Sequence, residues 1–163
     1  MGDYKISINA EWNIPDYSAN KFDPIGAEIA EKVANDARKN LRNSMGVDGN
    51  PLAKLETKTI KNKIAKGSAY PTRPLIDKGI MLNAIHVFKE GVAKYSVGPI
   101  ARGVPPRDLL AMIHQEIGVG KKRTTRIFLG ISNQMSKWID IRVKRFVAAQ
   151  ERSPKKTKKK YRG

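Results

Sequence analysis

Two long stretches of this sequence repeat an apolar residue at every fourth position, and they constrain the fold more than any other feature. The first consists of Ile25, Ile29, Val33, Ala37 and Leu41; the second consists of Met135, Ile139, Val143 and Val147, widened by Trp138 and Phe146. Residues four apart lie on one face of an α-helix, so each stretch predicts an amphipathic helix with one buried side. We expect these helices over about 24–44 and 133–150.

Both predicted helices begin at a capping sequence. Asp23 followed by Pro24 is typical of a helix N-cap with proline at the first helical position, and Ser132 can cap the second helix. The second helix is expected to end near Gln150, just before a lysine-rich tail.

Three shorter patterns predict β-structure. Tyr4, Ile6, Ile8, Ala10 and Trp12 occupy every second position, which is typical of a half-buried strand. Two runs of β-forming residues flank Glu90-Gly91 and predict a hairpin at about 84–98. The apolar run from Arg126 to Ser132 predicts a further strand. Together with the helices, these patterns predict an α+β fold in which the two long helices pack a small, mostly antiparallel sheet.

The remaining segments are loops and short helices within one expected domain, residues 1–151. The glycine- and lysine-rich stretch at about 46–74 predicts a long mobile loop that contains a short helix from about Thr57 to Ala65. A second short helix is expected to open near Asp77, whose carboxylate can cap it. A third is expected to stop at Gly118. Residues 152–163 are expected to form a basic, disordered tail.

The sequence offers little for catalysis. It contains no cysteine, which excludes thiolate metal sites and disulfides. His114 and Glu116 are two residues apart, so on a helix they point in nearly opposite directions and cannot share one substrate atom. The glycines near Lys121 precede a predicted strand, whereas a phosphate-binding loop of the Walker type precedes a helix. We therefore expect no enzyme, no metal and no cofactor.

The net charge of +17 favours anionic partners, nucleic acid foremost. The basic residues gather at 54–66, at Lys121, Lys122, Arg123 and Arg126, and in the tail at Lys155, Lys156, Lys158, Lys159 and Lys160. A charge run is usually only a solvated surface. The functional alternative is sequence-independent attraction to phosphates, for which the loop 121–123 and the tail are the candidates. Since no apolar run reaches the length of a membrane span, we expect a soluble protein without a membrane partner.

Several short motifs follow one another in a characteristic order along residues 25–148. They include Gly49 with Pro51-Leu52, Thr57 with Lys61 or Thr59 with Lys63, Leu75-Ile76 with Gly79, Val97-Gly98, Ala111 with His114-Gln115 and Gly118, and Arg126 with Phe128-Leu129-Gly130. This succession resembles the phage virion morphogenesis family, the tail-completion and head-to-tail joining proteins of long-tailed bacteriophages.

The resemblance implies a non-enzymatic structural protein of the virion neck, made in the cytoplasm of the host bacterium. It implies a ring of identical copies, expected to be hexameric, that contacts neighbouring neck proteins and the tail-terminator or tail-tube proteins. In such a ring the motif residues Gly79, His114, Gln115, Gly118, Arg126, Phe128, Leu129 and Gly130 have structural roles, and basic loops can meet double-stranded DNA in the channel.

Two other hypotheses remain at this point. The net charge of +17 and the lysine-rich tail are the basis for an alternative, a free-standing, sequence-independent basic DNA-binding protein. A metal-dependent hydrolase or nuclease depends only on His114 and the carboxylates near it in the sequence.

Overall fold

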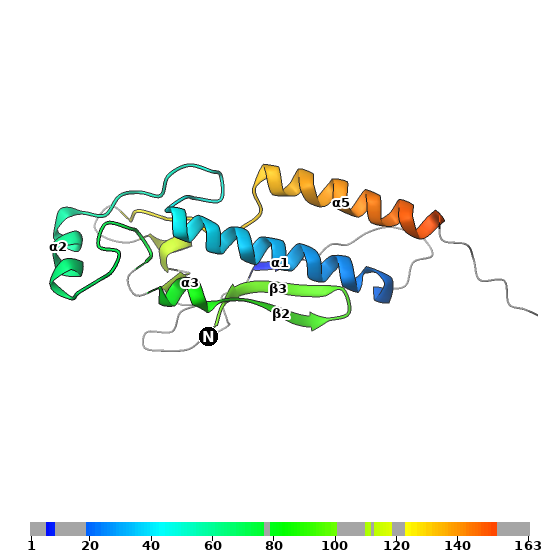
Figure 1. Ribbon diagram of the computed structural model, residues 1–163, viewed down its shortest axis with the longest axis horizontal. Coiled ribbons are helices and arrows are strands. Elements are labelled where there is room, and N and C mark those ends of the chain that lie inside the picture. Colours follow the sequence, from blue (N-terminus) through cyan, green and yellow to red (C-terminus); the bar gives the residue numbers. More distant parts are fainter. Residues whose placement is uncertain are drawn as a thin grey trace, which may run out of the picture.

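Helix α1, Ala19–Asn43, lies between a small sheet and the second long helix, α5, Asn133–Arg152 (Figure 1). The computed structural model describes residues 6–8, 19–76, 79–100, 110–111, 113–118 and 123–152, and only the backbone at 6–8, 19 and 80. The other elements are β1 (Ile6–Ile8), α2 (Thr57–Ala65), α3 (Ile80–Ala84), β2 (Ile85–Gly91), β3 (Lys94–Pro99) and the π-helical turn η1 (Ile113–Ile117). The α+β class and the two long helices are as predicted.

The sheet has the strand order β1-β3-β2, and both pairs are antiparallel. Val97 of β3 is opposite Ile6 on one side and Val87 on the other. The helix α1 covers β2 and β3, while α5 packs on α1 (Figure 1). The three elements therefore form three layers, with α1 in the middle.

The middle position of α1 explains why its apolar surface is wider than one stripe. Ile25 and Ile29 join Val143 of α5 in a small cluster. Val33, Leu41 and the alanines between them face the sheet and belong to the main core. A helix covered on two sides needs apolar residues on two sides. In α1 the set that meets α5 lies in the first half of the helix, and the set that meets the sheet follows it.

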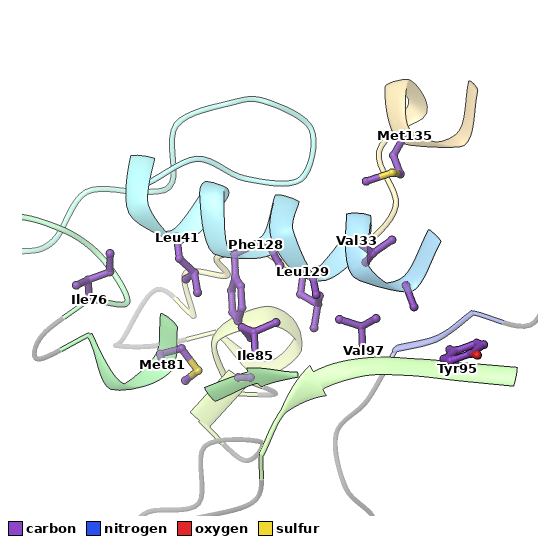
Figure 2. Close-up of a cluster of buried hydrophobic side chains, with 14 residues drawn as sticks. Val33, Leu41, Ile76, Met81, Ile85, Tyr95, Val97, Phe128, Leu129 and Met135 are labelled. Atoms are coloured by element: carbon purple, nitrogen blue, oxygen red, sulfur yellow. The ribbon is translucent and has the colours of Figure 1, made fainter. Parts of the chain in front are cut away.

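The main core brings together segments that are far apart in the sequence. Figure 2 shows Phe128 and Leu129 below α1, close to Ile85 and Val97 of the sheet, with Met81 and Ile76 at one end. Phe128 is fully buried and Leu129 is 1% exposed. Burying side chains of this size contributes about 1.5–3 kcal/mol each, so the segment 128–129 is a structural part of the core.

The start of α1 differs from the prediction. The helix begins at Ala19 and contains Pro24, so Asp23 is not its N-cap. The Asp23 carboxylate instead accepts hydrogen bonds from Lys89 Nζ (2.6 Å), the Ala93 amide (2.8 Å) and the Tyr95 hydroxyl (2.9 Å). These bonds, the one from Lys89 first, lower the pKa of Asp23 to about 2. The carboxylate therefore joins α1 to the hairpin instead of capping the helix.

The hairpin turn also lies elsewhere than predicted. Its two connecting residues are Val92 and Ala93, because Gly91 still pairs with Lys94. Pairing is irregular between Lys89 and Gly91, and Ala93 has a φ of 53°. The contact between the Ala93 amide and Asp23 is a tertiary interaction, so the local sequence alone did not locate the turn.

Of the predictions for the shorter elements, some are confirmed and others are wrong. The helix at Thr57–Ala65 is confirmed, and so is the cap of α5, because the Met135 amide donates to Ser132 Oγ at 3.1 Å. The helix α3 starts at Ile80 after Gly79, whereas the predicted cap, Asp77, lies outside the described residues. The predicted strand at 126–132 is wrong: this segment pairs with no strand of the described sheet.

Candidate functional site

The segment 126–129 is held by a buried glutamine. Gln115 of η1 is 6% exposed, and its Oε1 accepts hydrogen bonds from the amides of Phe128 (3.1 Å) and Leu129 (2.7 Å). These two amides would need a neighbouring strand if the segment were part of the sheet. Because one side chain satisfies both of them, the segment can remain irregular and still be buried.

Arg126 connects the same segment to two further parts of the chain. Its amide donates to the His114 carbonyl oxygen at 2.6 Å. Its guanidinium donates to the carbonyl oxygens of Ala53 (3.0 Å) and Lys54 (3.3 Å). The side chain is 7% exposed, and burial lowers its pKa. We name Gln115, Arg126 and the backbone of 126–129 the clamp.

The loop 45–53 completes the surroundings of the clamp. The Val47 amide donates to the Ile127 carbonyl oxygen at 2.9 Å, and Asn40 of α1 donates to the Phe128 carbonyl oxygen at 3.3 Å. Met45 and Pro51 form an isolated antiparallel bridge that closes the loop. The backbone of 126–129 is thus bonded from η1, from this loop and from α1, which is why it needs no strand partner.

Gly118 has a steric role beside the clamp. It has a φ of 79°, and a Cβ at this position would lie 2.1 Å from the carbonyl oxygen of Arg123. Only glycine fits such a close approach of two backbone segments. A Cβ at Gly130 would meet Val47 at 3.4 Å, an ordinary contact.

His114 lies half-buried next to the clamp. Burial and, to a smaller extent, the charge of Arg126 lower its pKa. Within the described residues its buried Nδ1 has no hydrogen-bond partner. The neighbouring Glu116 is exposed, and no cluster of three or more metal-ligating side chains occurs in the described part of the chain. Within the described part of the chain, no carboxylate is bonded to the His114 ring to orient it.

A groove of about 950 Å³ opens beside the clamp. It is lined by four residues of α1, by the loop 46–53, by the segment 125–127, by residues 130–135 and by Trp138; the α1 residues are Lys32, Asp36, Lys39 and Asn40. Ile127 and Ile131 are 52% and 43% exposed at this groove. Partly exposed apolar residues around a concave surface are typical of an interaction site.

The predicted basic candidates are only partly described. Arg123 is exposed, with a φ of 46°. Lys121, Lys122 and the tail lysines Lys155, Lys156, Lys158, Lys159 and Lys160 lie outside the described residues. Of the motif residues that carry the resemblance, Gly79 is the N-cap before α3 and takes no part in the clamp's hydrogen bonds.

A basic projection formed by residues 53–73 was not among the predicted site residues. It contains α2 and lies at the far end of the molecule from the hairpin turn (Figure 1). The lysine cluster in the sequence was the available signal, but a charge run alone does not distinguish a projecting helix from an ordinary solvated face. We name residues 53–73 the arm.

Comparisons with models of protein families, with curated proteins and with solved structures gave no match to this chain. Among the described helices, none is long and apolar enough to cross a bilayer.

Proposed function

We propose that this chain is a structural virion protein of the phage neck, which completes the tail and joins it to the head as a ring around the DNA channel. In this proposal the ring is hexameric. Its neighbours are other neck proteins and the tail-terminator or tail-tube proteins. The protein acts through its surfaces and catalyses no reaction.

The convergence of the motif residues carries this proposal. His114, Gln115, Arg126, Phe128 and Leu129 belong to the ordered set that resembles the phage family. Gln115 accepts from the amides of Phe128 and Leu129, and the Arg126 amide donates to the His114 carbonyl oxygen. Arg126 also reaches Ala53, next to the motif residues Pro51 and Leu52. Motifs spread over some eighty residues therefore maintain one buried junction, which supports a role for them in building the fold.

The groove beside this junction supports a role in assembly. Ile127 and Ile131 expose apolar surface there, although their neighbours Phe128 and Leu129 are buried. In a ring, each copy offers one surface to the next copy, and a different surface receives it. We propose that the groove, with Ile127 and Ile131, is one side of such a contact between copies or with the next ring.

The decisive experiment is deletion of the gene from the phage or prophage that encodes it, followed by electron microscopy of lysates. DNA-filled heads and separate tails are expected, and supplying the chain from a plasmid should restore joined particles. Joined, infectious particles in the absence of the chain would refute the proposal.

The groove contact is tested by complementation with variants. The double variant Ile127→Asp/Ile131→Asp should fail to restore joined particles while its circular dichroism spectrum stays that of the wild type. Val92 and Ile141 are 51% and 50% exposed outside the groove lining, so Val92→Asp/Ile141→Asp is the matched control and should complement. Equal complementation by both variants would exclude the groove as the contact.

The alternative function is a free-standing, sequence-independent DNA-binding protein, and the basic arm is the observation that favours it. It predicts that deletion leaves head-to-tail joining intact, whereas the purified chain binds duplex DNA with strong salt dependence. The deletion experiment therefore separates the two functions directly.

A further inference from the structure

The arm projects from the molecule but is fixed at both of its ends. Leu52, before the arm, is 8% exposed, and Ile76, after it, is 4% exposed and belongs to the main core. Between them, no residue from Ala53 to Arg73 is buried. A segment of this length that packs nothing into the core adds little to the stability of the fold, so its order calls for another explanation.

Side-chain hydrogen bonds of Lys63 and Arg73 hold the arm in place. Lys63 Nζ donates to the carbonyl oxygens of Tyr70 (2.7 Å), Arg73 (2.9 Å) and Ile76 (2.5 Å), which closes the loop after α2 against the helix. Arg73 then donates to the Arg42 carbonyl oxygen at the end of α1 (3.0 Å). A nine-residue helix is marginal on its own in water, and these bonds hold it in place.

The other lysines of the arm are exposed to solvent. Lys58 and Lys61 lie three residues apart and therefore on the same side of α2, and Lys54 and Lys66 flank its two ends. All four residues are exposed. The arm contains six basic residues and only Glu56 as an acidic one. It is thus a preformed helix with a strongly positive, uncovered surface.

We propose that the arm binds the phosphate backbone of double-stranded DNA, through Lys58, Lys61 and Lys66, without reading the base sequence. This inference rests on the proposed function only for the place where the contact occurs, the DNA channel. It assigns the main DNA contact to the arm instead of the loop 121–123.

Two features favour phosphates over a protein partner, and a third disfavours contact with the bases. The exposed cations are lysines on flexible stems, which suit point-charge contacts to phosphates. Because a nine-residue helix is about 13 Å long, and a duplex carries one charge per ~1.7 Å, the lysines meet phosphates in any register. Tyr70, the only aromatic residue of the arm, is occupied by the Arg73 guanidinium at 5.2 Å, so base stacking is not offered.

The test is duplex binding by the full-length chain at several salt concentrations. A fluorescent duplex of random sequence is titrated with the wild type and with Lys58→Gln/Lys61→Gln/Lys66→Gln. The plot of log K against log salt has a negative slope. The loss of three phosphate contacts should make this slope shallower by about 2.7. Between 50 and 200 mM salt, the affinity of the variant should therefore change about 40-fold less than that of the wild type.

The matched control removes three exposed cations elsewhere, Lys94→Gln/Lys137→Gln/Arg145→Gln, and should keep most of the wild-type slope. Equal losses in both triple variants would show that only total charge matters and would overturn the proposal. An unchanged slope in the arm variant, with binding abolished by glutamine at the five tail lysines, would assign the contact to the tail instead.

A second binding measurement uses polyglutamate as an acidic protein probe. If the arm variant loses binding to polyglutamate but not to the duplex, the arm docks on an acidic protein surface and the proposal fails. Complementation of the deleted gene separates this result from the proposed function. A variant that loses duplex binding but still joins heads to tails leaves the neck proposal intact, whereas failure of the deletion experiment removes it without affecting the duplex measurement.

Discussion

Replacing Gln115 by methionine tests whether the clamp holds the buried segment 126–129. Methionine has nearly the same length and keeps the apolar packing, but it removes the Oε1 atom that accepts from the amides of Phe128 and Leu129. Both residues are essentially inaccessible to water, at 0% and 1% exposure. Water therefore cannot replace the lost acceptor without opening the core.

The expected cost follows from these two unpaired donors. A buried N–H without a partner costs about 1–3 kcal/mol, so the two unpaired amides should lower the free energy of unfolding of Gln115→Met by about 2–6 kcal/mol. Domains of this size lose ~2–4 °C in Tm per kcal/mol, which corresponds to a fall of roughly 4–24 °C. Since whole domains are stable by only ~5–15 kcal/mol, the effect should be easy to detect.

Urea unfolding followed by circular dichroism measures this change, with linear extrapolation to water. Gln134→Met is the control, because Gln134 is exposed in the first turn of α5 and should change stability by no more than ~0.5 kcal/mol. If Gln115→Met were as stable as this control, the two hydrogen bonds would not be what holds 126–129 in place, and the clamp would be a wrong interpretation.

Three further predictions follow from the same structure. Gly118→Ala should cost at least ~2 kcal/mol more than Gly49→Ala in urea unfolding, because both glycines have positive φ but only at Gly118 does the new Cβ meet the backbone of Arg123. The Asp23 carboxylate has a folded pKa of about 2 against an ordinary 3.8. The stability that it contributes is therefore complete above about pH 4 and is lost as the pH falls toward 2. In Asp23→Asn, the fall of Tm between pH 4 and 2 should be smaller by this contribution. Because the pKa of His114 is lowered in the folded state, the unfolded chain binds this proton more readily, and the stability of the fold declines as the pH falls below 6.5. An NMR titration should place the midpoint of the His114 ring below 6.5. An ordinary or raised midpoint would contradict its burial.

Elements whose pattern repeats along their own length were predictable from the sequence. The four-residue ladders placed both long helices, and the Ser132 cap, the helix at Thr57–Ala65 and the stop at Gly118 were located correctly. Periodicity, capping and glycine stops are local properties, because they depend on residues within one or two turns of each other. The α+β class followed from the same local patterns.

Elements that depend on distant partners were not predictable in this way. Asp23 was expected to cap α1, but it binds the hairpin residues Lys89, Ala93 and Tyr95. The run 126–132 has the composition of a strand, yet the amides of Phe128 and Leu129 are satisfied by Gln115, more than ten residues earlier. A carboxylate or amide side chain can serve several backbone partners equally well, and only the tertiary structure determines which one is near.

The candidate site also has features that follow from the sequence alone and features that depend on the tertiary structure. The sequence by itself determined which residues belong to the motifs and that the chain is strongly basic, because both are properties of composition and order. Only the tertiary structure brought Gln115 and Arg126 into one clamp, left Ile127 and Ile131 exposed beside a groove, and separated Lys63, which ties the arm together, from Lys58, Lys61 and Lys66, which face solvent. The physical reason is that burial and hydrogen bonding are settled between segments distant in sequence, whereas the number and order of charges are fixed along the chain.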